Sequence, residues 1–546
     1  MKEKDREVEY ILNLRQEAED ATKDRIEAAK ELWSLFQNRQ DYSKKKDWQS
    51  KVCVPKVYMA VIQAASMVKR AIMSPRKLFK LDTVHPDDEE AKSQREEIEL
   101  MLKEHVRRSN FVDAYHETMV ESFLVGRGIT KVLWEGGLRY INVDSAECFI
   151  DPDFQAGSGK SPKYIIERKE MDLAELRDMA KRINDESEGK PFNMAEINKI
   201  EDFSDTTENY ERQMRRDLSN YSSRDKRVKI LEFWGDIVSK DGKSLKKNQL
   251  RVIANDKYVI RSQDNPFIHE SAPYILTIPI IYPHRGVWGI SLAEPVARLQ
   301  YAYNNIMNLI IDNLNFSVNK VFETQDTNLI NPRSLTQLYP GKIVHKHTSA
   351  PALTEVRTSG VSQDVFYTLG IAESEIQKGT AVTEFLLGTA GKTKTATEAE
   401  LKTSQAQGLF DTIARDIEQN SLAPLMEMTF DLLVQFANIT PALRNRYKLN
   451  VGGLSLLLAK RDQMSSIAQT LQLALQSQTI ASMTDIKELY QKYLNFHNLE
   501  DVFTKGQGPN LDQQQQLQQQ AREQAEKEVQ GMSEEEIMAA AQKAGI

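Results

Sequence analysis

One long helix with two different faces is predicted for residues 289–319, which read GISLAEPVARLQYAYNNIMNLIIDNLNFSVN. Ser291 and Glu294 form an S-x-x-E capping box, and Pro295 falls in the first turn, where its missing N–H costs least. Apolar residues at three- and four-residue steps predict a packing face along this helix. They are Val296, Leu299, Tyr303, Ile306, Ile310 and Leu314. A helix over 291–317 makes a rod of roughly 39 Å, which sets the scale of the fold.

The same helix carries a second stripe that is polar. Its members are Asn304, Asn308, Asp312 and Asn315. On the pattern alone, an ordinary solvated face is the commoner interpretation. Helices with two distinct faces and an amide-rich third side also suit packing against copies of themselves around a ring, so both interpretations stay open.

A compact insertion separates this helix from a second one. Residues 318–358 contain NPRSLTQLYPGKIVHKH and two short strand-like runs, and a helix over 361–380 returns from them. A glycine- and threonine-rich loop over 381–395 then precedes a helix predicted for 396–439, whose start is marked by a T-x-x-E capping box. Pro424 inside that helix predicts a kink.

The residues on either side of this central part differ in character. Residues 1–290 alternate amphipathic helical patterns with strand-like segments, including a hairpin with its turn at Gly136-Gly137. The stretch of about 157–227 is mostly polar and charged, and we expect much of it to be a surface excursion with one short helix. After the central part, 440–505 is again helical and 506–546 is rich in glutamine, which predicts a mobile tail or a short barrel.

Bulk composition excludes several classes of protein. The formal net charge of −7 argues against a broad basic face that grips nucleic acid, but not against a protein past which nucleic acid slides. The longest apolar run, YILTIPIIYP, is too short to span a bilayer, so no membrane association is expected. The charged N-terminus does not have the pattern of a signal peptide. Cys53 and Cys148 are the only cysteines, so we expect no disulfide framework and a reducing compartment.

The loop LLGTAGKTKT contains the letters G-K-T and therefore raises the alternative of a nucleotide hydrolase that uses residues 388–395. The P-loop pattern requires a glycine five positions before Gly391, and that position holds Leu386. The residues before the loop also have helical rather than strand spacing, so nucleotide binding is disfavoured.

Other enzyme signatures are weak. His269 lacks the second histidine of a zinc-protease motif, and His345 and His347 form a pair without a third ligand in view. No catalytic, metal-binding or cofactor-binding residues are therefore predicted.

Three segments, in this order, resemble portal proteins, the head-to-tail connectors of tailed bacteriophages, and especially those of short-tailed podoviruses. GRGITKVLWEGG with INVDSAECFIDPDF resembles wing strands, and residues 289–319 resemble the first stem helix. GTAGKTKTATEAELKTSQAQGLFDTIARDIEQNSLAPLMEMTFDLL resembles the tunnel loop and kinked helix. The likeness covers roughly residues 45–440.

The resemblance implies a mainly α portal fold with an α+β wing and clip, assembled as a ring that usually has twelve subunits. It implies a wing over 1–290, stem helices over 291–317 and 361–380, and a clip over 318–358. It also implies a tunnel loop over 381–395, a kinked wing helix over 396–439 and a crown over 440–505. Such a ring occupies one capsid vertex of the virion after synthesis in the host cytoplasm.

The resemblance also implies partners and roles for particular residues. Double-stranded DNA passes through the ring, driven by the large terminase ATPase, and further partners are the major capsid protein, the scaffolding protein and the head-to-tail adaptor. Lys392 and Lys394, with Thr393 and Thr395, are expected to meet DNA in the channel as point charges. Residues expected in clip docking are Arg333, Tyr339, Lys342, His345 and His347. The amide stripe would form a polar face toward the channel or a neighbouring subunit.

Overall fold

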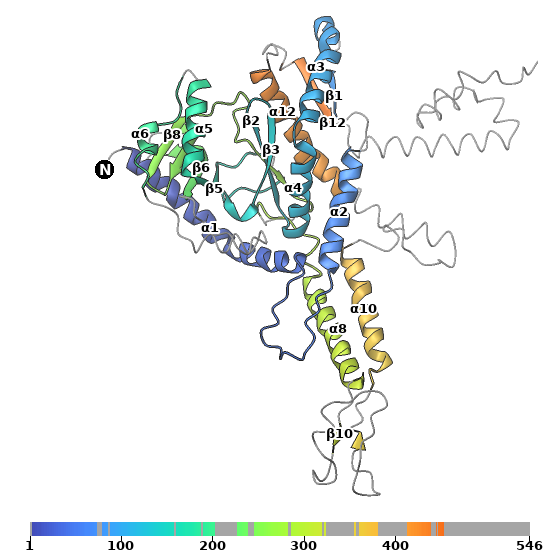
Figure 1. Cartoon of the computed structure of the whole chain (residues 1–546). Coiled ribbons are helices and arrows are strands. Elements are labelled where there is room, and N and C mark those ends of the chain that lie inside the picture. The colour runs from blue at the N-terminus through green and yellow to red at the C-terminus, as the bar shows by residue number, and fades with distance from the viewer. Residues whose placement is uncertain are drawn as a thin grey trace, which may run out of the picture. The chain divides into compact units, whose positions relative to one another are not determined.

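The computed structural model describes only part of the chain (Figure 1). The described residues are 3–73, 79–85, 88–157, 160–186, 189–201, 227–238, 245–281, 286–318, 322–323, 354–355, 360–380, 412–437, 444 and 446–451. Residues 1–455 form one compact unit, and residues 456–546, which form a second, lie outside the described residues. About half of the described residues are helical and several antiparallel sheets accompany them, so the fold is mixed α/β rather than mainly α.

Four helices dominate the first 125 residues. They are α1 (Glu3–Phe36), α2 (Lys56–Met73), α3 (Glu89–Arg108) and α4 (Phe111–Val125). Asp88 caps α3 by accepting from the N–H of Ala91, as expected for an N-terminal carboxylate. Gly126 ends α4 in the left-handed conformation, with φ of 90°.

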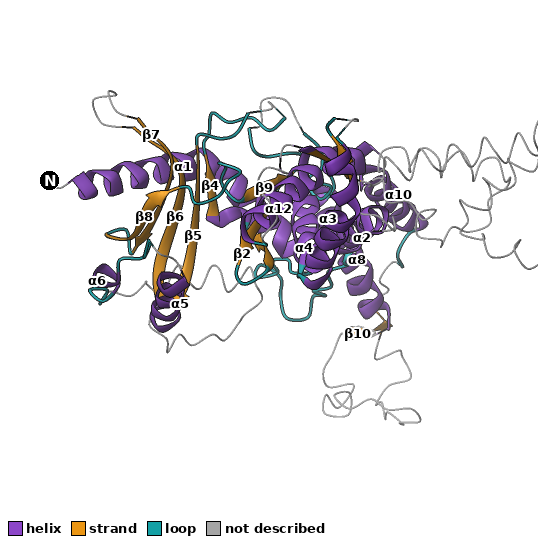
Figure 2. Cartoon of the chain, turned by 90° about the horizontal axis from the view of Figure 1, so that it is seen from above, coloured by secondary structure: helices purple, strands orange, loops and turns teal. Residues whose placement is uncertain are grey.

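The larger sheet has five antiparallel strands in the order β4-β5-β6-β7-β8. Their bounds are β4 (Cys148–Ile150), β5 (Tyr164–Asp172), β6 (Arg227–Val238), β7 (Leu245–Ala254) and β8 (Tyr258–Asp264). Helix α1 packs on one face of this sheet, where Val8 and Ile11 meet Ile166 and Phe233 in a buried core (Figure 2). Helix α5 (Leu173–Glu186) packs against β5, and α6 (Met194–Ile197) lies beside β8.

The smaller sheet has three antiparallel strands in the order β3-β2-β9. They are β2 (Gly128–Trp134), β3 (Leu138–Val143) and β9 (Tyr274–Thr277). The β2–β3 hairpin turns at Gly136-Gly137 as predicted, and Glu135 N–H donates to Gly137 O across the turn. A short 3-10 turn, η1 (Ser145–Glu147), leads from β3 to β4.

The expectation for the polar stretch of about 157–227 was wrong in one important respect. This stretch contains β5, which is an inner strand of the five-stranded sheet. Only the first residues of β5 are apolar, and the rest read ERKEMD. Its charged residues resemble those of a loop in the sequence, but Glu167 is buried in an ion pair described below.

Two helices run antiparallel and side by side as a pair, which we call the stem: α8 (Ala297–Val318) and α10 (Gln363–Thr380) (Figure 1). Helix α8 begins six residues later than predicted. Ser291 Oγ does accept from Glu294 N–H at 2.7 Å, but this contact stabilises a turn before the helix. At the far end of the stem, β10 (Phe322–Glu323) pairs with β11 (Thr354–Glu355).

The helix around Pro424 is irregular, as expected for an internal proline. A π-helical turn, η3 (Glu418–Leu422), precedes α12 (Ala423–Phe436), and Ala423 N–H donates to Glu418 O. Proline has no N–H for the preceding turn, which explains why the α-helical pattern breaks there.

Strand β12 (Tyr447–Val451) pairs with β1 (Phe79–Thr83) within the first unit. This unit therefore extends past residue 440, where the crown is predicted to begin, because the strand belongs with the N-terminal part of the chain. The crown itself stays a prediction, since most of 440–505 lies outside the described residues.

Candidate functional site

Four side chains of α8 form an evenly spaced polar set that we call the amide ladder: Gln300, Asn304, Asn308 and Asp312. A spacing of four residues places them along one face of the helix. All four residues are buried. The amides can both donate and accept hydrogen bonds, whereas the carboxylate only accepts.

The ladder binds the strap, which we define as Ser50–Val54 in the linker between α1 and α2. Every second strap N–H donates to one ladder side chain: Ser50 to Asp312 (2.7 Å), Val52 to Asn308 (2.8 Å) and Val54 to Asn304 (3.0 Å). Two ladder amides also donate to strap carbonyls: Asn308 Nδ2 to Val52 O (2.9 Å) and Gln300 Nε2 to Val54 O (2.7 Å).

The regularity of this contact has a geometric cause. Four residues of an α-helix rise by about 6.0 Å, and two residues of an extended chain advance by about 6.6 Å. The two repeats nearly match, so consecutive ladder side chains reach alternate residues of the strap. Because the bonds go to backbone groups, the ladder recognises extended chain rather than particular side chains.

Gln300 also joins the ladder to α2. Its Oε1 accepts from the N–H of Val57 at 2.8 Å, in the first turn of α2, where backbone N–H groups have no partner within the helix. The predicted polar stripe omitted Gln300, although the four-residue spacing from Asn304 could have revealed it.

The structure brings three members of the predicted polar stripe together with the strap. Asn304, Asn308 and Asp312 are buried against it within the same chain, whereas Asn315 is exposed. An ordinary solvated face is therefore wrong for these three residues. A role for the stripe at the channel or at a neighbouring subunit stays a prediction.

The apolar stripe of α8 contributes to packing within the stem. Tyr303 and Ile310 are buried, Leu299 and Ile306 are half-buried, and Leu314 is exposed.

One basic side chain ties α2, α8 and α10 together. Lys56, at the start of α2, lies over the Tyr303 ring of α8, with its Nζ atom 5.2 Å from the ring centroid. The same ammonium group pairs with Glu373 of α10. The stem is therefore joined to the helix that follows the strap.

A buried ionic network joins the two sheets. Lys131 Nζ of β2 lies 2.6 Å from Glu167 and 2.7 Å from Glu232, and Lys169 Nζ lies 2.8 Å from Glu232. Tyr274 OH donates to Glu167 at 2.7 Å. Burial alone would raise the pKa of Glu232, but the two lysines hold it well below its usual value. Two positive and two negative side chains thus balance in the interior.

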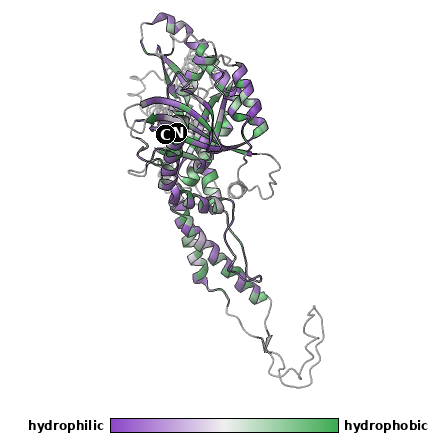
Figure 3. Ribbon diagram, turned by 90° about the vertical axis from the view of Figure 1, so that its left-hand side faces the viewer, coloured by the Kyte–Doolittle hydropathy of each residue, from purple (hydrophilic) through white to green (hydrophobic). Residues whose placement is uncertain are grey.

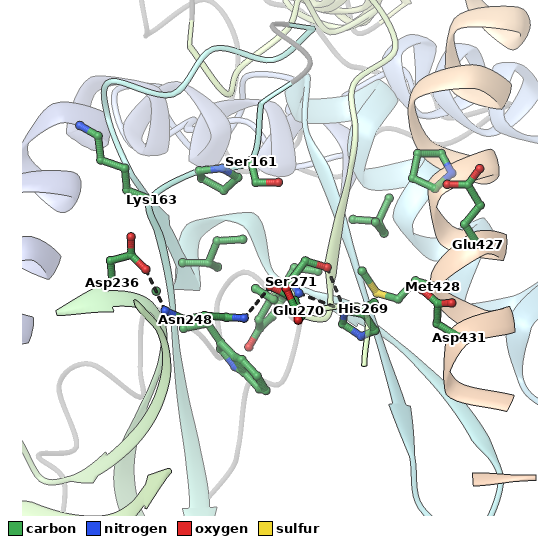
Figure 4. A pocket seen from close by; sticks show the side chains of 18 residues that line it. Ser161, Lys163, Asp236, Asn248, His269, Glu270, Ser271, Glu427, Met428 and Asp431 are labelled. Carbon is green, nitrogen blue, oxygen red and sulfur yellow. Dashed lines mark hydrogen bonds between the residues drawn. The ribbon is translucent and has the colours of Figure 1, made fainter. Parts of the chain in front are cut away.

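A cleft of about 600 Å³ lies between the two sheets and α12 (Figure 4). Glu427 and Asp431 reach it from α12, while Asp236 and Asn248 line the opposite side (Figure 4). Burial, followed by the nearby Asp431, raises the pKa of Glu427. The lining is therefore acidic on the α12 side.

His269 is the residue of the cleft closest to catalytic chemistry. Its Nδ1 lies 2.9 Å from Ser271 Oγ and accepts from the Ser271 backbone N–H at 3.2 Å, which closes a local turn. Burial lowers the pKa of His269 to about 4. Asp431 is engaged by Arg444 through two bonds of 2.7 and 2.9 Å instead of orienting the imidazole. The geometry does not assemble a nucleophile, base and orienting acid.

Most of the other predicted site residues cannot be placed. The tunnel-loop residues Lys392, Thr393, Lys394 and Thr395 lie outside the described residues, as do the clip residues Arg333, Tyr339, Lys342, His345 and His347. In the part of the chain that the structure describes, no cluster of histidine, cysteine and carboxylate side chains is suited to a metal ion.

Comparison with known families decides the identity. The family model described as "Phage SU10 portal protein" matches residues 135–448, which is more than half of the chain. The chain belongs to the phage SU10 portal protein family. SU10 is a podovirus, so the resemblance to portals of short-tailed phages is confirmed. No curated protein matches the chain.

Membership in the portal family frames the features above. The family is structural and non-enzymatic, and it implies a homo-oligomeric ring. The match includes the stem and the amide ladder, whereas the strap precedes residue 135 and lies outside the matched segment. Among the described helices, none combines the length and apolarity needed to cross a bilayer.

Proposed function

We propose that this chain assembles into a ring of twelve subunits at one capsid vertex and acts as the conduit for packaging and ejecting double-stranded DNA. The observation that carries the proposal is the portal-family match over 135–448, which includes both stem helices and the residues between and after them. On this proposal the chain is a virion component without catalytic activity, and a separate large terminase ATPase moves the DNA.

The stem supports this proposal. Its two helices leave large apolar side chains exposed in the single chain, among them Leu309, Leu314 and Tyr367. Exposed apolar surface of this kind is typical of interaction sites, and neighbouring subunits in a ring would cover it. Asn315, the exposed member of the polar stripe, would then face the channel or a neighbour.

The channel loop over 381–395 would supply the contacts to DNA. Lys392 and Lys394 are point charges suited to phosphates, and Thr393 and Thr395 keep the loop hydrated. Against a net charge of −7 for each chain, a thin basic girdle would let DNA pass without tight binding.

The clip over 318–358 would dock the large terminase during packaging and the head-to-tail adaptor afterwards. Its candidate contact residues are Arg333, Tyr339, Lys342, His345 and His347. The wing over 1–290 would meet the major capsid protein and the scaffolding protein during capsid assembly.

The first test is the native mass of the purified full chain, together with negative-stain images. We expect a single oligomer near twelve subunits, with a central hole. A chain that stays monomeric under every condition in which capsids assemble would refute the proposal.

The role of the channel loop is tested by replacing Lys392 and Lys394 with alanine. We expect lower DNA packaging or retention with normal ring assembly, because the phosphate contacts are lost while the stem is untouched. Lys402→Ala, on the helix predicted to follow, removes one charge from the same region as a control. Normal packaging and retention in the double variant would contradict the assignment.

A further inference from the structure

The stem carries two separate apolar surfaces that the single chain does not cover. The first, which we call the strap face, consists of Trp48, Leu309 and Phe316, which are 55%, 66% and 40% exposed. The second, which we call the α10 face, consists of Tyr367 and Ile371, which are 73% and 46% exposed. Figure 3 shows hydrophobic residues along both stem helices.

The α10 face points away from α8. Ile376 and Thr380 are the buried residues of α10 and lie four residues apart. Nine residues separate Tyr367 from Ile376, so at about 100° per residue their side chains lie on opposite sides of the helix. Ile371 is four residues from Tyr367 and shares its side.

The strap face is assembled from two parts of the chain. Leu309 and Phe316 are seven residues apart, and so they share one side of α8. Trp48 packs on Phe316 with ring centroids 5.1 Å apart. Trp48 is only two residues before Ser50, whose N–H is held by Asp312 of the amide ladder. The ladder therefore positions Trp48.

The two faces lie at the same level along the stem. A Cβ at Gly379 would lie 2.6 Å from Val296 Cγ1, so these two positions face each other where the antiparallel helices meet. Tyr367 precedes Gly379 by twelve residues, which corresponds to residue 308 on α8. Tyr367 is therefore level with Leu309, although the two side chains are on different faces of the stem.

Charge is complementary at this level too. Residues 43–51, SKKKDWQSK, carry four lysines and one aspartate, a net charge of 4 − 1 = +3 in a chain of −7. Lys51 lies between two strap residues that donate to Asn308 and Asp312 of the amide ladder, so it is at the level of residues 308–312. Asp364 is exposed on α10, and the same antiparallel count places it at the level of residue 311.

We propose that the α10 face of one subunit packs against the strap face of the next copy of this chain, with Asp364 directed toward Lys51. The inference rests on the proposed ring and assigns its contact surfaces, including a linker that lies outside the family match. Because the two faces are different surfaces, the contact is head-to-tail, and head-to-tail contacts that close produce rings. The ladder thereby fixes an interface element as well as an intrachain contact.

Disulfide cross-linking tests the contact. Leu309→Cys and Tyr367→Cys are made as separate chains, mixed during assembly and oxidised. We expect a covalent dimer from the mixture and no more than the wild-type background from either variant alone. Thr368→Cys mixed with Leu309→Cys is the matched control, because Thr368 is also exposed but is turned about 100° from Tyr367.

The outcomes separate the two proposals. Intact rings in which the Leu309–Tyr367 mixture gives no more dimer than the control overturn the assigned surfaces, whereas absence of rings in the wild-type chain overturns the proposed function. If the cysteine variants do not assemble, charge reversal decides instead. Lys51→Glu and Asp364→Lys should each lower the ring fraction at low salt, and combining them should restore it. Lack of restoration overturns the inference.

Discussion

Replacing Asn308 by alanine should release the strap from α8. The asparagine side chain accepts from Val52 N–H and donates to Val52 O. In the variant, Val52 O keeps a hydrogen bond from the Tyr42 hydroxyl at 2.7 Å, but Val52 N–H loses its partner. The perturbation therefore removes two hydrogen bonds and leaves one backbone donor without a protein acceptor.

The magnitude follows from these contacts. An orphaned buried donor costs about 1–3 kcal/mol, and the second lost hydrogen bond adds about 1 kcal/mol. Val52 is 42% exposed, so water can reach the opened site and the lower end of the range applies. We expect a loss of about 2 kcal/mol in the free energy of strap opening, which corresponds to about 30-fold more opening.

Hydrogen–deuterium exchange measures this opening directly. Peptides that cover residues 48–55 should exchange about 30-fold faster in Asn308→Ala than in the wild-type chain, while peptides from the β-sheets should be unchanged. Asn315→Ala is the matched control, because Asn315 is an asparagine of the same helix that is exposed. Equal exchange in the two variants would refute the reasoning that the ladder holds the strap.

Three further predictions concern the wing. Lys131→Ala leaves two buried carboxylates without their shared cation and should destabilise the fold by about 3–5 kcal/mol in urea unfolding, whereas Arg139→Ala, at an exposed pair, should cost less than about 1 kcal/mol; similar losses would contradict a buried network. Burial raises the pKa of Glu121 to about 7, so the folded state retains a proton that the unfolded state releases above about pH 4.5, and wild-type stability should fall as pH rises from about 4.5 to 7. Glu121→Gln should remove up to about 3 kcal/mol of that fall, and identical pH profiles of the melting temperature would argue against it. Gly126→Ala places a Cβ 2.6 Å from a backbone oxygen at φ of +90° and should lower the melting temperature by several degrees, whereas Gly137→Ala, with open space around it, should leave it nearly unchanged.

The stem could be predicted from the sequence because its signals are local. Apolar residues at helical spacing lie within one or two turns of each other, so residues 289–319 and 361–380 reveal helices without knowledge of the fold. The helix start was less accurate: Ser291 forms its predicted contact, but turns occupy the residues up to Val296 before α8 begins.

Strand β5 could not be predicted from hydropathy because its burial is compensated elsewhere. Glu167 has the character of a surface residue in the sequence, and it becomes an interior residue only because Lys131, 36 positions away, is placed opposite it. A charged side chain is stable inside a protein only when a partner is supplied, and the identity of that partner is a property of the fold.

The sequence by itself determined the stem helices, the wing hairpin and the resemblance to portal proteins that the family match bears out, since each depends on residues close together in the chain or on a recognisable order of segments. Only the tertiary structure decided what the amide stripe does. The partners of Asn304 and Asn308 are backbone groups about 250 residues away, and backbone groups have the same chemistry at nearly every residue. Nothing in the local sequence distinguishes an amide that will face water from one that will hold an extended strand.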